Sequence, residues 1–391
     1  MTTMLEPGRR TALVIGGGIA GPVVAMFLRR AGLDPVIFEG RPAPVDEAGA
    51  FLNLAPNGLA VLEPLGLAGT VGAAGTPTKA IEFLNHRGRK LGRFPETTLL
   101  IRRGALHRAL REAALGEGIR IEYGKRLAGV DLQAAGAEAR FADGTSRRGD
   151  LIVGCDGVHS ATRRAILPDA RVPEYTGVVD SGGFAPADAA DADGVMRMIF
   201  GRRGFFGWQV TPSGEAFWFE NFHQRTPPGF GRMTDAEWRE HLLALHRGDP
   251  TPVAGCIRST TGPLGRWPIY DLPTLPTWHR GAVCLVGDAA HATSPHAGQG
   301  ASLALEDAIV LARCLRDCAD LETAFSRFEA ERRPRVEKLV REARRTGKRK
   351  AAGNAFSRGV RDLLLPVFLR MGMQGLREVY RYRVEWEARA A

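Results

Sequence analysis

The segment TALVIGGGIAG, residues 11–21, is the clearest structural signal in this sequence. It begins with the short apolar run 11–15, which is typical of a buried strand. Glycines follow, and residues 19–31 have the pattern of a helix that ends before Gly32. A second apolar run, 35–39, completes a strand–helix–strand unit. Such a unit predicts a parallel sheet with a right-handed crossover.

The glycines of this segment have the G-x-G-x-x-G spacing. Gly16 permits a tight turn, Gly18 lets the backbone approach a pyrophosphate, and Gly21 allows the helix to pack closely on the strand. The start of a helix also attracts phosphate groups. Glu39 closes the second strand, where a carboxylate holds a ribose diol. The unit therefore predicts dinucleotide binding, although the spacing does not distinguish FAD from NAD.

A second strand with an acidic end lies much later in the chain. The apolar run 282–286 precedes Gly287 and Asp288, and the turn PHAGQG at 295–300 then leads into a helix through Asp307. Ligands gather at the carboxyl ends of parallel strands, and the free N–H groups at a helix start favour anions. One ligand that spans this segment and the first must be long, as FAD is.

A third segment, DLIVGCDG at 150–157, has a strand that ends near Asp156. Arg163 lies about one helical turn further along the chain, so we expect its guanidinium to meet a phosphate. Taken alone, this segment is also typical of an ordinary strand–turn–helix connection.

Together the three segments resemble the fingerprints of the class A FAD-dependent monooxygenases, the family of para-hydroxybenzoate hydroxylase. Their order and spacing match over residues 16–307, and RGAL at 103–106 resembles the R-x-x-L segment of that family. Ser302 departs from the pattern, since the family usually has Asn there, and a serine side chain is shorter.

The resemblance implies a set of residues that bind FAD. They are Gly16, Gly18, Ala20, Gly21, Glu39, Arg41, Arg103, Leu127, Asp156, Asp288, Pro295, Gly298, Gln299, Gly300 and Ala301. The glycines would hold the pyrophosphate, Glu39 the adenosine ribose and the backbone of Leu127 the adenine, while 295–301 would line the isoalloxazine. His296 lies inside this loop and is a candidate for acting on the substrate, with a polar but non-catalytic loop residue as the alternative.

The resemblance also implies the reaction. NADH or NADPH would reduce the flavin as a transient co-substrate, and no second G-x-G-x-x-G exists for a separate nicotinamide domain. Dioxygen would then form a flavin C4a-hydroperoxide, which would hydroxylate or epoxidise an aromatic or polycyclic small molecule. No metal is needed. Two alternatives stay open: an FAD-dependent reductase of the same superfamily, such as a prenyl-chain reductase, and a non-catalytic flavin-binding protein.

The expected architecture is a mixed α/β fold, in which a Rossmann-like FAD-binding domain is interleaved with an antiparallel-sheet substrate domain and followed by C-terminal helices. The FAD-binding parts are 1–75, 101–174 and 268–330, the substrate-lobe parts are 76–100 and 175–267, and the helical region is 331–391.

The substrate lobe is expected from its alternating aromatic runs. The candidate pocket residues are Arg197, Trp208, Gln209, Trp218, Asn221 and His223, with packing inside the lobe as the competing interpretation. Strand alternation puts Phe217 and Asn221 on one face and Trp218 on the other. The sequence does not say which face meets the flavin.

Composition favours a globular cytoplasmic protein. Apolar residues make up 44% and charged residues 25% of 391. No apolar run approaches the ~20 residues of a membrane span, and neither a signal peptide nor a disulfide framework is indicated. The net charge of +10 is concentrated in 331–350, which we interpret as a solvated helical face with pairs such as Glu337 and Arg341, not as a nucleic-acid site. Peripheral membrane contact through 358–383 stays open.

Overall fold

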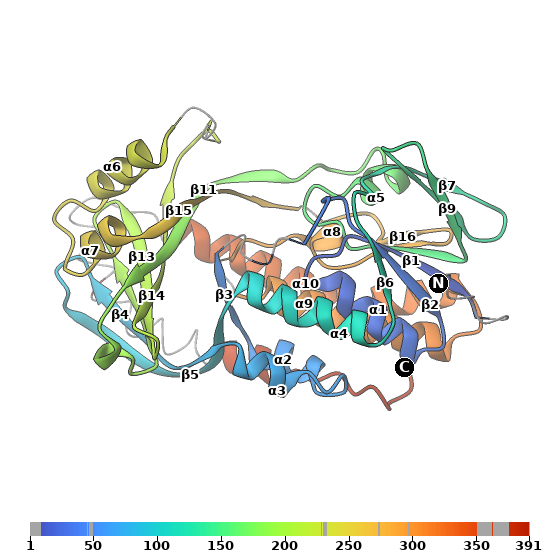
Figure 1. The fold of residues 1–391 in the computed structure, drawn as a ribbon, viewed down its shortest axis with the longest axis horizontal. Coiled ribbons are helices and arrows are strands. Elements are labelled where there is room, and N and C mark those ends of the chain that lie inside the picture. Colours follow the sequence, from blue (N-terminus) through green and yellow to red (C-terminus); the bar gives the residue numbers. More distant parts are fainter. Residues whose placement is uncertain are drawn as a thin grey trace.

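The computed structural model describes residues 9–44, 46, 50–227, 229, 233–272, 274–295, 298–349, 362 and 375–390. Two large sheets dominate the fold and lie at opposite ends of the molecule in Figure 1. The long strands β11 and β15 reach from one end toward the other (Figure 1). The mixed α/β class expected from the sequence is confirmed.

The first sheet has six strands in the order β16-β17-β10-β1-β2-β6. They are β1 (Thr11–Ile15), β2 (Asp34–Phe38), β6 (Arg120–Glu122), β10 (Leu151–Gly154), β16 (His279–Arg280) and β17 (Val283–Leu285). All neighbours pair in parallel except β16 with β17. Helix α1 (Ala20–Arg30) makes the crossover from β1 to β2.

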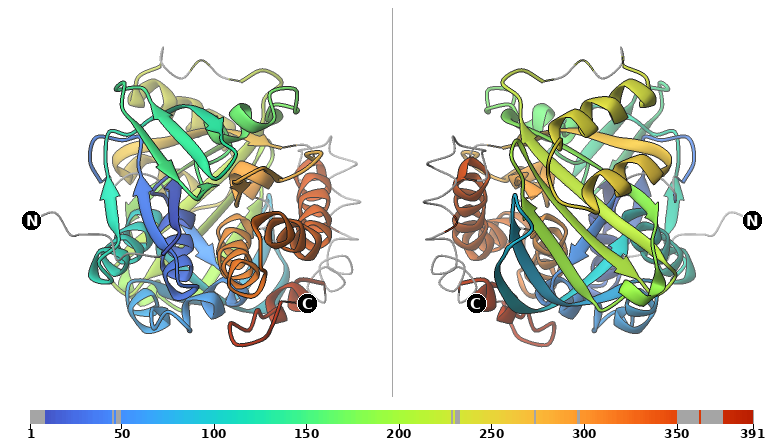
Figure 2. Two further views of the ribbon diagram at one scale, coloured as in Figure 1. Left: turned by 90° about the vertical axis from the view of Figure 1, so that its right-hand side faces the viewer. Right: turned by 90° about the vertical axis from the view of Figure 1, so that its left-hand side faces the viewer.

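Helices and a small sheet cover the two faces of the six-stranded sheet, as Figure 2 shows. On one side lie α1, α9 (Gly300–Asp317) and α10 (Leu321–Arg349). On the other lie β7 (Leu127–Leu132), β8 (Ala137–Phe141) and β9 (Ser146–Gly149), with α5 (Ala161–Ile166) beside β7. The remaining helices of this part are α2 (Pro56–Leu62), α3 (Ala68–Ala73), α4 (Arg103–Gly116) and α8 (Asp288–His291).

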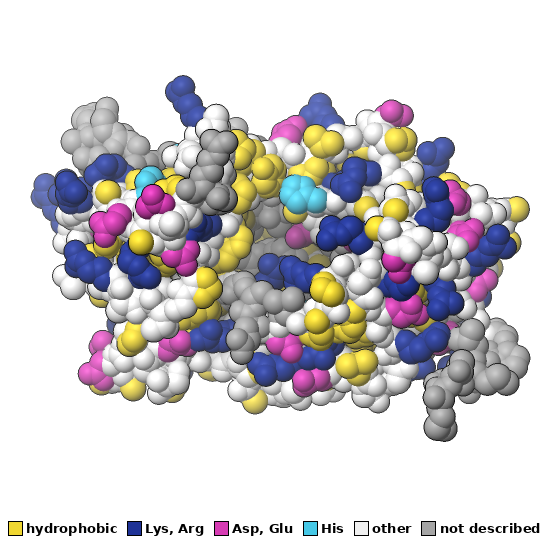
Figure 3. All heavy atoms as spheres, turned by 45° about the horizontal axis from the view of Figure 1, so that its top comes forward, with side chains coloured by type: hydrophobic (Ala, Val, Ile, Leu, Met, Phe, Trp, Pro, Cys, Tyr) yellow, Lys and Arg dark blue, Asp and Glu magenta, His cyan; other side chains and the backbone are white. Residues whose placement is uncertain are grey.

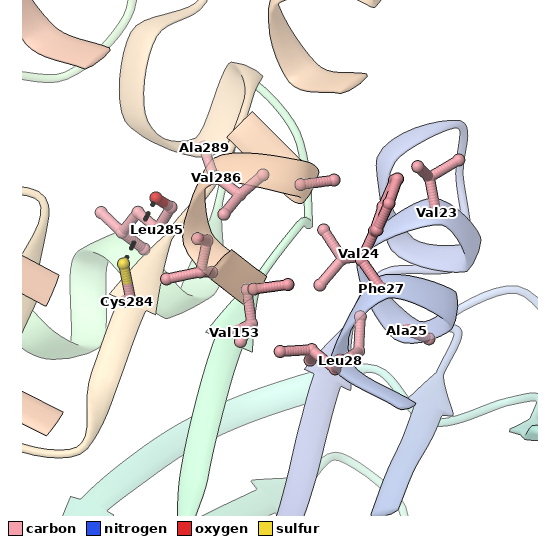
Figure 4. Close-up of a cluster of buried hydrophobic side chains, with 14 of the residues drawn as sticks. Val23, Val24, Ala25, Phe27, Leu28, Val153, Cys284, Leu285, Val286 and Ala289 are labelled. Atoms are coloured by element: carbon pink, nitrogen blue, oxygen red, sulfur yellow. Dashed lines mark hydrogen bonds between the residues drawn. The ribbon is translucent and has the colours of Figure 1, made fainter. Parts of the chain in front are cut away.

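The core of this part lies between α1 and the sheet. Val24, Phe27 and Leu28 of α1 point toward Val153 of β10 and toward Val286 (Figure 4). All five side chains are at most 1% exposed. Burying one such side chain stabilises the fold by roughly 1.5–3 kcal/mol. This contact therefore fixes the position of α1 on the sheet.

The second sheet has eight strands in the order β15-β11-β14-β13-β12-β4-β5-β3. They are β3 (Phe51–Leu54), β4 (Thr76–Asn85), β5 (Lys90–Arg102), β11 (Glu174–Pro186), β12 (Val195–Phe200), β13 (Gly204–Thr211), β14 (Glu215–His223) and β15 (Thr261–Asp271). Neighbours are antiparallel except β12 with β4. The edge strand β3 comes from the segment that the sequence analysis gave to the nucleotide-binding part; four residues are too few to show a strand period.

The two faces of the eight-stranded sheet have different partners. On one face, Trp208 and Trp218 pack with α6 (Asp235–Leu245) and α7 (Val253–Ser259). On the opposite face, Phe217 and Phe219 pack with Phe51 of β3. A short 3-10 turn, Ala189–Asp191, lies between β11 and β12.

Helix α10 differs from its sequence interpretation as a solvated face. The predicted pair of Glu337 and Arg341 is present at 3.7 Å. Arg332, however, is 0% exposed, because α9 presents the carboxylates of Glu306 and Asp307 to it. Hydrophobic periodicity alone could not reveal that a basic residue faces inward.

The segment 358–383, considered for membrane contact, lies mostly outside the described residues. Its described end packs on the protein: Tyr382 stacks on Arg335, and nearby Trp386 contacts Phe27. Among the described helices, none combines the length and the apolar character that a membrane span requires.

Candidate functional site

The candidate cofactor residues meet at one edge of the six-stranded sheet. Because β17, β10, β1 and β2 are adjacent and parallel, their carboxyl ends share this edge. The strands deliver Asp288, Asp156, Gly16 and Glu39 respectively, each within a few residues of the strand end. This is where ligands bind in open α/β sheets.

The glycine turn after β1 is as tight as its spacing predicts. Gly16 has a φ of 105°, and a Cβ there would lie 2.5 Å from the carbonyl oxygen of Cys155. A Cβ on Gly21 would lie 2.0 Å from the carbonyl oxygen of Gly16. A Cβ on Gly18 would meet nothing within 4 Å, so the backbone there is open to a close approach. Ala20 begins α1 directly after this turn.

The carboxylate of Glu39 is held in place by backbone donors. Its Oε2 accepts a hydrogen bond from the N–H of Gly17 at 2.7 Å, and its Oε1 accepts one from the N–H of Arg41 at 2.9 Å. The N–H of Lys125 donates to the carbonyl of Glu39 at 2.8 Å. This last bond brings the segment that leads into Leu127, the first residue of β7, beside Glu39.

Asp288 lies within electrostatic reach of Arg103. Asp288 is open to solvent, yet protein surrounds it closely enough that desolvation raises its pKa. The positive charges of His291 and Arg103 act in the other direction on the pKa of Asp288. Arg103 begins α4 and is exposed, so the RGAL segment and the strand end at Asp288 border one site.

The loop before α9 continues this site. The N–H of Gly298 donates to the carbonyl of Pro295 at 2.8 Å, and Gln299 is the N-terminal cap residue of α9, followed by Gly300 and Ala301. His296 lies outside the described residues, so its role stays a prediction.

Polar atoms beside this loop fit a polar ligand. Among the described residues, Asn57 Oδ1, Thr293 Oγ1, Gln299 Nε2 and Ser302 Oγ are buried and have no hydrogen-bond partner. Most buried polar groups in native proteins are paired. Four such atoms together therefore indicate a surface built to meet a large polar group such as a flavin.

The polar side chains in and after the third segment, residues 150–157, form hydrogen bonds within the protein. The Asp156 carboxylate accepts hydrogen bonds from the N–H groups of Ala161 and Thr162 at 2.7 and 2.9 Å, which caps α5. Arg163 is 2% exposed and donates to the carbonyls of Ala289 and Val158. The expectation that Arg163 meets a phosphate is therefore wrong, because backbone carbonyls occupy its guanidinium.

Two residues of the site were missed in the sequence. His107 Nε2 lies 2.7 Å from the carbonyl oxygen of Gly17, and Asn57 Nδ2 donates to Gln299 Oε1 at 3.0 Å. His107 follows Arg103 by one helical turn, and this spacing is the only signal that could have suggested it. Asn57 lies in a helix with no recognisable motif.

The substrate candidates divide between the two faces of the eight-stranded sheet. Trp208, Trp218 and Arg197 lie on the α6/α7 face, where Arg197 pairs with Asp193 at 2.6 Å. The two tryptophans fill a core on that face, so we remove these three from the set expected to touch a substrate.

Gln209 and Asn221 lie on the face of Phe217 and Phe219, toward β3. Gln209 Oε1 accepts a hydrogen bond from Thr78 at 2.7 Å. His223 is exposed at the end of β14. Seen from outside, the surface is hollowed between the two ends of the molecule (Figure 3).

Comparison with known proteins agrees with this geometry. Residues 9–343 match a family model described as an FAD binding domain. The chain is 32% identical to the aurachin C monooxygenase/isomerase of Stigmatella aurantiaca, over 91% of this chain and 93% of that protein. It is 32% identical to the 3-amino-4-hydroxybenzoate 2-monooxygenase PtnB3 of Streptomyces platensis, over 88% and 89%.

This chain belongs to the class A flavoprotein monooxygenases. The solved structure of Klebsiella pneumoniae HpxO with FAD and uric acid superimposes with a TM-score of 0.84 and 26% identity, over 97% of both chains. As a class A monooxygenase, the chain is an FAD-dependent oxidoreductase. The family and cofactor expected from its three fingerprints are thus confirmed.

Proposed function

We propose that this chain hydroxylates or epoxidises an aromatic or polycyclic small molecule, with NADH or NADPH and dioxygen as co-substrates. The observation that carries the proposal is the meeting of four strand ends with a loop whose buried polar atoms lack partners, beside an apolar sheet face. The names of the relatives support an aromatic substrate, since they include an aminohydroxybenzoate monooxygenase.

FAD, when bound, supplies the redox and oxygen chemistry. The protein must therefore bind the cofactor, orient the substrate beside it and shield both from water. We assign Gly16, Gly18, Ala20 and Gly21 to the pyrophosphate, because the turn is open at Gly18 and the helix start attracts phosphate. Glu39 is already oriented by two backbone N–H groups, so its carboxylate suits a ribose diol.

The remaining candidate residues would lie around the residues that bind the pyrophosphate and the ribose. Arg41 and Arg103 would run along the cofactor, the backbone of Leu127 would meet the adenine, and Asp288 would accept from hydroxyl groups of the ribityl chain. Asp156 would act by holding the turn after β10 through its cap of α5.

The helix start at α9 would face the flavin. The first turn of a helix has free N–H groups and a partial positive charge. Pro295, Gly298, Gln299, Gly300 and Ala301 place this start beside Asn57 and Ser302. The backbone donors there would stabilise negative charge on the reduced ring, as an oxyanion hole does.

The substrate would lie on the sheet face that packs with β3. Met198 and Phe219 on that face are only partly buried, and Phe51 bridges Phe184, Phe217 and Phe219 with ring centroids 5.4–6.3 Å apart. An apolar wall with a few fixed polar groups, here Gln209 held by Thr78, is typical of small-molecule sites.

The test is to purify the protein, titrate it with FAD and follow the consumption of NADH, NADPH and dioxygen with a panel of phenols. We expect FAD to bind and a phenol to accelerate the consumption of one pyridine nucleotide with matching oxygen uptake. Pyridine-nucleotide oxidation that proceeds without oxygen uptake and saturates a prenyl chain would identify a reductase instead. FAD binding without any turnover would identify a binding protein.

A further inference from the structure

Arg332 of α10 lies in the interior of the protein between two carboxylates of α9. Its guanidinium is 2.7 Å from Glu306 Oε2 through Nη1 and 2.8 Å from Asp307 Oδ1 through Nε. All three side chains are 0% exposed. The ring of Tyr382 lies over the guanidinium, with 5.6 Å from its centroid to Cζ. Among the described residues, Arg332 makes its hydrogen bonds and ion pairs with Leu303, Glu306 and Asp307, none of which belongs to the candidate cofactor set.

One arm of this cluster leads from Asp307 to the strand end at Asp288. Asp307 Oδ2 accepts a hydrogen bond from the N–H of Gly287 at 3.0 Å and lies 2.5 Å from His291 Nε2. Burial opposes ionisation of Asp307, but His291 and Arg332 outweigh it and lower its pKa to about 2. A charged Asp307 therefore holds both ends of the turn that carries Asp288.

The other arm leads from Glu306 to the loop before α9. Glu306 Oε1 accepts a hydrogen bond from Asn57 Nδ2 at 2.7 Å, and the same amide donates to Gln299 Oε1 at 3.0 Å. Arg335 also donates to Glu306, at 2.8 and 2.9 Å. Asn57 and Gln299 are each 1% exposed, so these bonds do not compete with bulk water.

We propose that Arg332 is a positioning residue of the FAD site, which sets the 287–288 turn through Asp307 and the 298–301 loop through Glu306 and Asn57. The proposal rests on the assignment of these two segments to the cofactor. Nε of Arg332 donates to Asp307 Oδ1, whereas Nη1 makes an ion pair with Glu306 Oε2 without hydrogen-bond geometry. A planar guanidinium holds these two nitrogens at a fixed spacing, whereas an ammonium is a single point charge that cannot face both carboxylates in the same way. Breaking a buried ion pair also leaves an unpaired charge, so the neighbours must move.

The experiment compares Arg332→Lys with the wild type in FAD titrations of the apoprotein and in the visible spectrum of the bound flavin. Arg341→Lys is the matched control on the same helix, because its side chain is 61% exposed and pairs only with Glu337 among the described residues. Ile257→Ala is a second control: Ile257 is 0% exposed in the remote lobe, so its loss destabilises the fold without touching either arm.

We expect Arg332→Lys to weaken FAD binding about tenfold or more, which corresponds to about 1.4 kcal/mol, and to shift the flavin absorbance bands. Both controls should bind FAD with the affinity and spectrum of the wild type. Asn57→Ala provides a second route if Arg332→Lys does not fold, since it cuts the arm to Gln299 and leaves every charge paired. It should also shift the spectrum and weaken binding.

An unchanged affinity and spectrum in folded Arg332→Lys, or in Asn57→Ala if the lysine variant does not fold, would overturn the proposal. An equal loss of FAD affinity in Ile257→Ala would overturn it too, because general destabilisation would then explain the effect. A wild-type protein that binds no FAD would contradict the proposed function itself, and is thereby distinguished from a failure of this inference.

Discussion

A buried histidine at the end of α6, packed against the eight-stranded sheet, makes stability depend on pH. His246 is 3% exposed and lies 2.5 Å from Glu220 Oε2 through Nε2 and 2.9 Å from Asp249 Oδ2 through Nδ1. Burial lowers the pKa of His246, but hydrogen bonds to Asp249 and Glu220 outweigh it and raise the pKa to about 9 from an ordinary 6.5. The imidazolium donates to both carboxylates and ties the end of α6 to β14.

The size of the effect follows from this pKa. One tenfold change in proton affinity is worth about 1.4 kcal/mol, so the charged form stabilises the folded state by roughly 3 kcal/mol. Because the folded pKa is the higher one, this stability is fully present below about pH 6.5. It is lost as the pH rises through about 9.

The assay is urea unfolding of the apoprotein between pH 6 and pH 10, followed by tryptophan fluorescence. Other groups also titrate in this range, so His246→Gln is measured at each pH and the difference between the two proteins is compared. We expect the advantage of the wild type over the variant to shrink by roughly 3 kcal/mol across the range. A difference that stays constant with pH would refute the assignment of a charged His246.

Three further predictions concern packing at the site. Gly21→Ala should lower FAD affinity about tenfold or more and destabilise the fold by roughly 1–3 kcal/mol, because its Cβ would lie 2.0 Å from the carbonyl oxygen of Gly16. Both variants are compared with the wild type by FAD titration and by calorimetry, and Gly69→Ala is the control for Gly21→Ala, because a Cβ on Gly69 would meet nothing within 4 Å. Gly58→Ala should also weaken FAD binding in the titration, since its Cβ would lie 2.5 Å from Ser302 Oγ. If Gly58→Ala binds FAD as tightly as the wild type does, the contact with Ser302 does not matter for the site. Phe219→Ala should raise KM for the aromatic substrate about tenfold through lost apolar contact, whereas Trp208→Phe on the other face should leave KM unchanged; equal effects would mean that the faces are assigned wrongly.

Short-range sequence patterns predicted much of the fold. The G-x-G-x-x-G turn, the helix after it and the strand ending before Glu39 are local features with strong periodicity, and the structure has them within one residue of the expected bounds. Helix α9 begins directly after the predicted turn at 295–300 and contains Asp307, as expected. These elements depend on contacts between neighbours in sequence, which a pattern can show.

Long-range pairings could not be predicted in the same way. The joining of β3 to β5 and the packing of Arg332 under α9 depend on residues far apart in the chain. The site shows the same limit: Asn57 and His107 meet the cofactor segments only through the tertiary fold. Arg163 does not face a phosphate because its guanidinium donates to the carbonyl of Ala289, far away in the chain, and to that of nearby Val158.

The central claim is that this class A monooxygenase inserts an oxygen atom into an aromatic compound. It is tested most directly by turnover of the FAD-loaded protein under isotopically labelled dioxygen, with NADH or NADPH and a phenol that accelerates oxygen uptake. We predict a product that gains a single labelled oxygen atom, detected by mass spectrometry. A product without label, or oxygen consumption that yields only peroxide with every phenol tested, would contradict the account.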